Sequence, residues 1–496
     1  MSDRFSTDIL EEFGFVGFFN YRSVCLISIK STRNAYSLSG SESVKTEGDI
    51  AIPVSTESDS TIDERPTYCV VRGAHAFILW VSSYFGLAPL RFESRTNGFT
   101  VTISNAMCVY SYILVTILVI CTLYGLVAEI NAGVETSVRM SSKMSQVVST
   151  CDVLVVVATA GAGVYGAPRR MRDMVNFMEN IALVDYSIGG RYSDVTERKL
   201  CAVIMAIIIF FSLLVVDDFT FYTLQGKELH REWDVVTNYI GFYLLWYVVM
   251  ILELQFAFTA LSVRARFAAV NDTLALTTRH VCIPEEKPYG EPLNIYAIRV
   301  PQVNDGRTAN TIHFKKEAII VKRSVSGEPS LVVSPYDAVH RLASLHNTLC
   351  EVVKLIDNSY GLPLIMILIS TLLHLIVTPY FLIMEIFVTT KRVHFLVLQF
   401  LWCATHMLRM IVVVEPGYCT IAEGIRTEGL VCRLMTSAPS SGALPASLEL
   451  FSRQLMLRSV TYTPMGICTL NRPLVASVIG AVTTYLVILI QFQRYL

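Results

Sequence analysis

Residues Leu474 to Phe492 read Leu-Val-Ala-Ser-Val-Ile-Gly-Ala-Val-Thr-Thr-Tyr-Leu-Val-Ile-Leu-Ile-Gln-Phe, a stretch without a charged side chain. About 20 such residues in a helix cross the roughly 30 Å of hydrocarbon in a bilayer, so the stretch predicts a membrane-spanning helix. One face of that helix is mostly small and polar, because such residues recur at spacings of three and four: Ser477, Ala481, Thr484, Ile488 and Gln491. Small residues also favour ordinary close packing between helices, so the spacing alone leaves the role of this face open.

Six further apolar runs of similar length precede this one. The whole chain is 53% hydrophobic and only 16% charged, with a mean hydropathy of +0.51, which is typical of membrane proteins. The runs lack alternation with a period of two, and backbone groups in lipid must be satisfied within their own segment, so each run is predicted to be a helix. We therefore expect an all-α polytopic membrane protein with seven transmembrane helices, at about Met107–Ile130, Met144–Ala167, Leu200–Tyr222, Val235–Val263, Gly361–Val388, His394–Val414 and Pro473–Phe492.

Basic residues near the span ends predict the orientation, because loops rich in Lys and Arg stay in the cytosol. The connections after the second and fourth spans are the basic ones, with Arg169, Arg170, Arg172, Arg198 and Lys199 in the first and Arg264 and Arg266 in the second. Seven crossings then place the N-terminus inside and the C-terminus outside, the reverse of a G-protein-coupled receptor. The shorter run Ala74–Leu90 contains Gly86 and Pro89, which favours a surface or re-entrant helix over a full crossing.

The remaining segments predict the domain organisation. Residues 1–70 are expected to be a disordered cytosolic segment, 71–470 the transmembrane bundle, and 471–496 the final helix. The apolar pattern continues beyond the fourth span through Phe267–Leu276 and precedes the fifth span from Val339 to Ile356, so long helices extend into the cytosol. Residues of about 282–333 are interpreted as a flexible insertion. An amphipathic helix is predicted before the last span, from the spacing of Leu444, Leu448, Phe451 and Leu455.

Polar and aromatic side chains within the fourth to sixth spans are the candidates for a ligand site, because polar groups buried in a membrane need partners. Two stripes lie on the sixth and fifth spans, and a third group lies near the expected extracellular mouth. The candidates are Gln399, Trp402, His406 and Arg409; His374, Thr378, Tyr380 and Glu385; and Asp217, Asp218, Trp233, Asp234, Tyr239 and Tyr243. Aromatic walls with converging carboxylate, amide and imidazole groups suit a polyhydroxylated ligand.

The alternative for each of these residues is a structural role inside the bundle. In particular, His406 and Arg409 have a possible ionic partner in Glu253 of the fourth span. Asp152 of the second span is open to the same interpretation. The sequence does not distinguish a ligand contact from an interhelical hydrogen bond.

Enzymes and transporters are disfavoured by what the motifs lack. The histidines are scattered, no His-Glu-x-x-His or Gly-x-Ser-x-Gly run occurs, and no glycine-rich phosphate loop is present, so no catalytic residues, metal ligands or cofactor are expected. A secondary transporter, the competing class, would show internal repeats with paired broken helices, and the two halves show no such correspondence.

The C-terminal run resembles the signature of the insect gustatory receptors, through Thr484-Tyr485, five apolar residues and then Gln491-Phe492. The resemblance implies a ligand-gated cation channel in the plasma membrane, in which the final helices of four subunits line a central pore. Gln491 and Phe492 would then lie near the extracellular gate, Ile488 would form a hydrophobic constriction, and Thr484 would line the pore or pack against neighbouring spans. The implied partners are a small tastant, permeating cations, the bilayer, and identical subunits that assemble through the final helix and a cytosolic helical anchor, with no nucleic acid.

The subfamily is indicated by softer likeness. Multi-sugar receptors have Glu after Thr-Tyr, whereas this chain has Leu486. The runs His406-Met-Leu-Arg409, Val414-Glu415-Pro416 and Arg426-Thr427-Glu428 resemble the fructose-type receptors, which implies a small sugar, most simply fructose, as the ligand. A bitter-type receptor for apolar plant compounds is the alternative. One feature does not fit a cation pore, since the final span contains no acidic residue and Arg494 follows it.

Overall fold

The structure is a computed structural model. It describes residues 69–71, 73–95, 98–133, 137–138, 140, 143–188, 191–282, 320–323, 329–387, 393–438 and 444–495, with only the backbone for 69–70, 95, 98, 191–197, 282, 322–323, 387 and 492–495. All of these belong to one compact unit, Pro66–Leu496. Residues 1–68 of the predicted disordered segment 1–70 and most of the predicted insertion 282–333 therefore lie outside the described residues, while Cys69 and Val70 belong to a strand.

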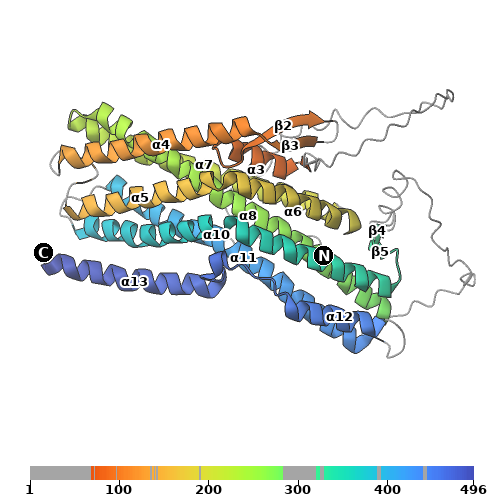
Figure 1. Cartoon of the computed structure of the whole chain (residues 1–496). Helices are drawn as coiled ribbons and strands as arrows, with labels where there is room; N and C mark the ends of the chain where they lie inside the picture. The colour runs from red at the N-terminus through yellow and green to blue at the C-terminus, as the bar shows by residue number, and fades with distance from the viewer. Residues whose placement is uncertain are drawn as a thin grey trace, which may run out of the picture. The chain divides into compact units, whose positions relative to one another are not determined.

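Seven helices are long and apolar enough to cross a membrane, which confirms the prediction of an all-α bundle with seven spans. Most of them run nearly side by side (Figure 1). The helices are α4 (Asn105–Ala132), α5 (Lys143–Tyr165), α7 (Arg191–Glu228), α8 (Glu232–Cys282), α10 (Pro335–Phe387), α11 (Val393–Ser437) and α13 (Arg472–Tyr495).

Three of these helices are much longer than a bilayer is thick. α8 has 51 residues, α10 has 53 and α11 has 45, and at 1.5 Å per residue each exceeds the roughly 30 Å of hydrocarbon by about twofold or more. The predicted helical extensions after the fourth span and before the fifth are therefore confirmed. The extension of α11 was not predicted: the sixth span was expected to end at Val414, but the helix continues through Pro416 to Ser437.

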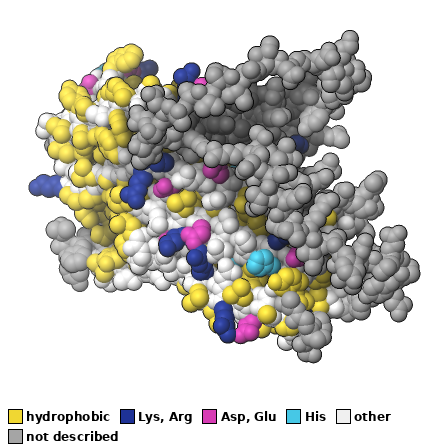
Figure 2. All heavy atoms as spheres, turned by 45° about the vertical axis from the view of Figure 1, so that its right-hand side comes forward, with side chains coloured by type: hydrophobic (Ala, Val, Ile, Leu, Met, Phe, Trp, Pro, Cys, Tyr) yellow, Lys and Arg dark blue, Asp and Glu magenta, His cyan; other side chains and the backbone are white. Residues whose placement is uncertain are grey.

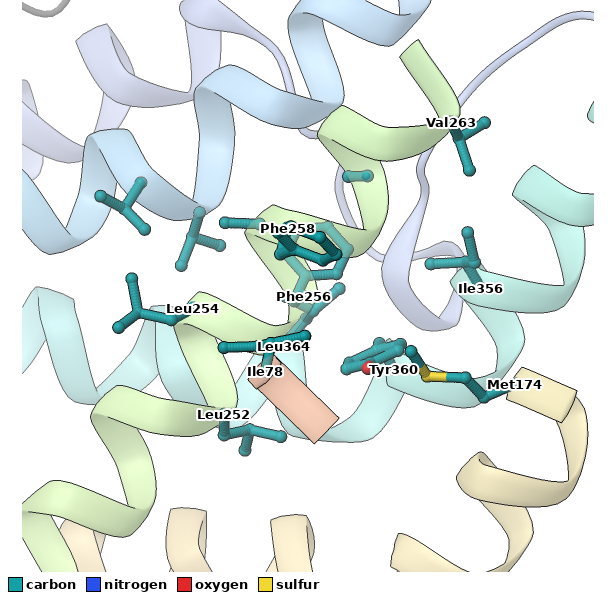
Figure 3. Close-up of a cluster of buried hydrophobic side chains, with 14 of the residues drawn as sticks. Ile78, Met174, Leu252, Leu254, Phe256, Phe258, Val263, Ile356, Tyr360 and Leu364 are labelled. Carbon is teal, nitrogen blue, oxygen red and sulfur yellow. The ribbon is translucent and has the colours of Figure 1, made fainter. Parts of the chain in front are cut away.

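Helix α8 lies at the centre of the bundle, where it packs against α4, α5, α7, α10 and α11. In its most apolar 18-residue window, 83% of the residues are buried. Figure 3 shows part of this core, where Phe256 and Phe258 of α8 lie near Tyr360 and Leu364 of α10 and Ile78 of α3 (Gly73–Tyr84). Because lipid is as apolar as these side chains, the core within the membrane is stabilised mainly by van der Waals packing between the helices.

A small antiparallel sheet and the short helix α3 precede the first span. The sheet has the order β1-β3-β2, with β1 at Cys69–Val71, β2 at Leu90–Arg95 and β3 at Gly98–Ile103. α3 has 12 residues and spans about 18 Å, which is too short for a crossing, as expected for this segment. The chain turns after α3 at Gly86, whose φ of +75° favours glycine.

Helix α6 (Ala167–Ile188) was not predicted, because its mixed polar sequence was interpreted as a basic loop. Its Arg170 is buried rather than exposed, and it donates to the carbonyls of Gly163 at 2.9 Å and Leu87 at 3.0 Å. Burial lowers the pKa of this guanidinium, while the nearby Tyr360 ring, 5.2 Å away, acts in the opposite direction. Arg170 therefore ties α6 to α5 and to the turn after α3, and it adds no exposed charge to the basic connection.

The predicted amphipathic helix is confirmed as α12 (Leu444–Leu457). Its four apolar residues are buried, and the helix packs on α10 and α11. Its apolar face is thus used within its own chain. At the end of the predicted insertion, β4 (Val321–Arg323) pairs with β5 (Pro329–Leu331), and the amide of Ile320 donates to the Ser187 carbonyl of α6, so this end of the range is structured.

The surface agrees with a membrane protein. Figure 2 shows hydrophobic side chains covering much of the upper left of that view, with a group of Lys, Arg, Asp and Glu side chains near its centre. Large exposed apolar residues recur along the spans, among them Ile113, Ile120, Leu213 and Phe400. Such a surface is stable when lipid rather than water covers it.

Candidate ligand site and pore helix

Four aromatic and imidazole rings from three spans meet inside the bundle, and we call them the histidine–tryptophan cluster: Trp246 of α8, His374 of α10, and Trp402 and His406 of α11. All four are buried. The two imidazoles stack with their centres 4.7 Å apart, and Trp402 stacks on His406 at 5.6 Å. Trp246 meets His374 edge-on at 4.8 Å. The predicted stripes of the fifth and sixth spans therefore do face each other, with Trp246 of α8 as a third side that was not predicted.

The charged partners of the cluster come from α5 and α8. His374 is hydrogen-bonded through Nε2 to Asp152 of α5 and through Nδ1 to the Ser370 carbonyl. Arg409 donates to both carboxylate oxygens of Glu253 at 3.1 Å, and its guanidinium lies 4.5 Å from the centre of the Trp246 ring. The structural alternative considered for Arg409 and Asp152 thus describes what these two residues do.

Most of the other predicted ligand residues are buried near the cluster or along the same helices. Gln399 lies on α11 about one turn before Trp402, and Thr378 and Tyr380 follow His374 on α10; all three are buried. Tyr243 is buried and donates to Asp218 of α7. Glu385 is also buried, but it lies 11 residues beyond His374, about 16 Å along the helix.

Three predicted residues lie outside this buried region, and one of them, Asp217 of α7, is exposed with its carboxylate 3.2 Å from the imidazole of His394. Trp233 is 75% exposed at the start of α8, and Asp234 is exposed and bound to Arg231 at 3.1 Å. Their distance from Trp246 along α8 is about 20 Å, because 13 residues at 1.5 Å each separate Trp233 from that ring. The structure does not bring them together with the histidine–tryptophan cluster.

A pocket that sequence reasoning missed lies beside the cluster, between α4, α5 and the first turns of α8. At its wall the fully buried Glu129 accepts hydrogen bonds from Asn238 at 3.0 Å and Ser137 at 2.8 Å, with Arg231 3.5 Å away. The signal was present, since Glu129 is the single acidic residue in an apolar span, and such residues mark sites. The lining residues are Thr122, Leu126, Glu129, Met140, Ser149, Val153, Asn238, Tyr239 and Phe242.

Phe242 connects the pocket with the cluster. It lines the pocket, and its ring lies 6.4 Å from that of Trp246, one turn further along α8. The space between these residues has room for about one water molecule, so Phe242 links the Glu129 network to the aromatic rings through close packing. The arrangement offers hydrogen-bonding groups at one end and flat apolar surfaces at the other, as a ligand with several hydroxyl groups requires.

Comparison with known proteins identifies the family. Residues 75–495 match the pattern of the 7tm chemosensory receptor family. The chain belongs to this family. The resemblance to gustatory receptors is therefore confirmed, and the protein is a multi-pass membrane receptor rather than an enzyme.

Among curated relatives of the receptor is the Drosophila melanogaster gustatory receptor for sugar taste 43a, which is 29% identical over 84% of this chain and 97% of its own length. The putative gustatory receptor 28a of the same species is 27% identical over 32% of this chain and 37% of its own length. Among solved structures, the insect olfactory receptor OR5 from Machilis hrabei shares the fold, with a TM-score of 0.56, 11% identity and coverage of 84% and 97% of the two chains. The structure of the same olfactory receptor in complex with eugenol matches this chain with a TM-score of 0.54.

The last helix of the receptor has two unlike faces. Leu474, Val475, Val478 and Val482 pack on α10 and α11, around Met410 and Val414. The face named from the sequence is turned away from the chain, with Ser477, Thr484, Ile488 and Gln491 exposed and Ala481 half-buried. The side chain of Phe492 lies outside the described residues. Within the described chain, no residue of the most apolar window of α13 is buried.

Proposed function

We propose that this receptor is a ligand-gated, non-selective cation channel of four identical subunits, whose pore is lined by α13. The observation that carries the proposal is the two-faced α13. Its apolar face is occupied by α10 and α11, while the face with Ser477, Thr484 and Gln491 is exposed, its two hydroxyls donating only to carbonyls of α13 itself among the described residues. Polar side chains in a membrane normally face protein or a water-filled cavity. A ring of α13 helices from four copies would supply both neighbouring protein and a water-filled cavity for these side chains.

The gate of this channel is proposed to lie on the same face. Ile488 is exposed one turn before Gln491, so four copies around an axis would form an apolar ring beside a ring of amides. A narrow apolar ring closes a pore by excluding water. Phe492 is assigned to the same gate from its position in the motif.

We further propose that a small sugar, fructose, opens the channel. Support comes from the histidine–tryptophan cluster, from the buried hydrogen-bonding groups around Glu129, and from a relative that is named for sugar taste. The residues proposed to hold the sugar are those buried on α8, α10 and α11: Gln399, Trp402, His406, His374, Thr378, Tyr380 and Tyr243. Glu385, Trp233 and Asp234 are assigned to the mouth of the site instead, because they lie a long way from the rings.

The hydrogen-bonding chemistry of the site explains how near-identical hexoses could be told apart. A ligand that lacks a matching hydroxyl leaves buried polar groups of the receptor unpaired, at a cost of about 1–3 kcal/mol each. One lost hydroxyl contact therefore corresponds to about 5- to 150-fold in affinity, since 1.4 kcal/mol is tenfold. Stacking on Trp402 and the two imidazoles would hold the sugar ring without selecting among hexoses.

Electrophysiology on cells that express this chain alone tests the proposal. We expect sugar-evoked current without a G protein, strongest for fructose in a panel of sugars and plant alkaloids. Currents evoked by alkaloids and by no sugar at millimolar concentration would assign the receptor to the bitter type. Uptake of a solute without ligand-evoked current would indicate a transporter.

Substitutions on α11 provide a matched test of the site. Trp402→Ala, His406→Ala and Gln399→Ala are expected to weaken the sugar response while the protein still reaches the surface. Phe400→Ala is the control, because this aromatic residue of the same helix is 63% exposed and faces away from the cluster. Equal loss of response in the control and the site variants would contradict the placement of the sugar.

A further inference from the structure

An ion pair joins the sixth and seventh spans at the beginning of the last helix. Arg472, the first residue of α13, donates to Glu415 of α11 through Nη2 at 2.6 Å and through Nε at 3.3 Å. Its guanidinium also lies 4.2 Å from the centre of the Tyr418 ring of α11. Two parallel hydrogen bonds and one ring contact fix both the position and the angle of an arginine more firmly than a single contact does. We call Glu415, Tyr418 and Arg472 the α11–α13 joint.

The segment that leads from α12 to α13 is seated on α11 next to this joint. A Cβ atom at Gly417 would lie 2.9 Å from the Cβ of Leu470, and one at Gly424 would lie 2.9 Å from the Cβ of Val460. Both distances are shorter than real Cβ contacts, so the segment rests directly on the α11 backbone at two glycines. Seven residues separate these glycines, which places them on one face of the helix. The entry to α13 is therefore held by α11 along two turns.

The same helix carries the histidine–tryptophan cluster. His406 lies nine residues before Glu415, about 14 Å along α11. Between them, Met410 and Val414 contact the apolar face of α13. Directly after Glu415, Pro416 lacks the backbone N–H that would bond to Val412, so the helix is more easily bent at this point than elsewhere. A bend there moves the joint relative to the cluster.

Few other contacts hold α13. Within the described residues it packs only on α10 and α11, through the first three turns of its apolar face, and the rest of the helix is exposed to its surroundings. A shift of its first residue is resisted elsewhere in the described chain mainly by α10, which packs on the same apolar face. The joint is the point at which a movement of α11 acts most directly on the last helix.

We propose that Glu415 and Arg472 are positioning residues that transmit ligand-driven movement of α11 to α13. The inference rests on the proposed function, since it takes α11 as a ligand-contacting helix and α13 as the pore helix. Neither residue contacts the cluster, so their part is in the transfer of the movement and not in binding. Weakening the pair separates the two events: the ligand still binds, and the channel opens less readily.

The test is a double-mutant cycle with Glu415→Gln, Arg472→Gln and the double variant. Fructose-evoked current gives the half-maximal concentration and the maximum, and fructose-dependent thermal stabilisation of the purified receptor gives binding. Both single variants should raise the half-maximal concentration or lower the maximal current by about 5-fold or more, in the usual range of coupling between sites. Binding should change by less than twofold, and the double variant should be no worse than the worse single one, because the pair acts as a unit.

The control is the pair Glu449–Arg453 on α12, which has the same 2.6 Å contact but lies on the exposed face of that helix. Glu449→Gln and Arg453→Gln should gate like the parent. If the Glu415 and Arg472 variants reach the surface and also gate like the parent, the joint has no part in opening, while the channel assignment stands. A parent that gives no ligand-evoked current overturns the proposed function instead.

A charge-reversed pair, Glu415→Arg with Arg472→Glu, tests whether a lost response comes from the broken ion pair or from misfolding. Either reversal alone places like charges together and is expected to abolish the response. The two together should recover a substantial part of it. If the receptor with both reversals reaches the surface and still binds fructose but gives no current, the proposed role of the joint is also wrong.

Discussion

Helices α8 and α13 are both membrane-length and mostly apolar, yet they occupy opposite environments in the chain. In α8, 83% of the most apolar window is buried, and in α13 none of it is, although the α13 window has the higher mean hydropathy. The difference lies in the polar residues. Glu253, Gln255 and Thr259 of α8 are buried, and such groups are stable in a membrane only where other helices or a water-filled cavity provide partners. Hydropathy therefore measures compatibility with lipid and does not measure burial within the chain.

The largest expected effect is at the buried ion pair of α8. Arg409→Ala leaves Glu253 buried without its main cationic partner, which should lower the free energy of unfolding by about 3–5 kcal/mol. Thermal unfolding of the purified receptor and surface labelling measure this effect. The double variant Glu253→Leu/Arg409→Met should recover much of the loss, because two apolar residues need no ionic partner. An Arg409→Ala receptor that melts like the parent would show that the pair contributes little to the core.

Substitution of one glycine in the buried contact of α8 and one in α13 compares the packing of the two helices directly. A Cβ at Gly125 of α4 would lie 2.1 Å from the Asn238 carbonyl oxygen of α8, whereas a Cβ at Gly480 of α13 would meet nothing within 4 Å. Gly125→Ala should therefore destabilise the receptor by about 1–3 kcal/mol through overpacking. Gly480→Ala should stay within about 0.5 kcal/mol, as for an open surface position. Melting temperatures of the two variants, measured side by side, decide this. Equal values would mean that α8 and α4 are less closely packed than the structure has them.

The sequence was sufficient for elements that are set by their own residues. The seven spans follow from apolar length, and the bounds of α12 follow from the spacing of Leu444, Leu448, Phe451 and Leu455. Helix α6 was missed because its stabilising contacts come from elsewhere. Its Arg170 is held by the carbonyls of Gly163 and Leu87, the latter 83 residues away, and a local pattern contains no sign of them.

The candidate site shows the same limit. The sequence placed His374, Trp402 and His406 on inward stripes, but not the side of the cluster that Trp246 supplies, since helical spacing does not say which stripes meet. Trp233 and Asp234 were attractive by residue type, yet they are exposed at the beginning of α8. Glu129 is visible in the sequence as a lone carboxylate, but its role in the pocket depends on Asn238, which is 109 residues away.

The exposed face of α13 provides a prediction with a large effect on current and a small one on folding. Ile488→Ser should increase the current without ligand, because a polar ring no longer excludes water from a narrow pore. Its effect on the free energy of unfolding of a single chain should be within about 0.5 kcal/mol, since Ile488 is partly exposed. Leak current and melting temperature are measured on the same variant. Leu213→Ser, at an exposed position of α7, is the control and should not leak. If Ile488→Ser reaches the cell surface and shows no increase in current without ligand, this face of α13 lies against protein or lipid and not in the pore.

The smallest effect is expected from a tag that changes no contact, and it tests the side of the membrane on which α13 ends. The basic residues that follow the second and fourth spans favour an inside N-terminus and an outside C-terminus by the charge rule, although Arg170 and Arg266 among them are buried. An epitope placed after Leu496 should be labelled on intact cells, and one placed before Ser2 only after permeabilisation, with sugar responses unchanged in both. N-terminal labelling of intact cells would reverse the orientation. The Glu129 network at the end of α4 would then lie on the cytosolic side of the bundle, away from a tastant outside the cell.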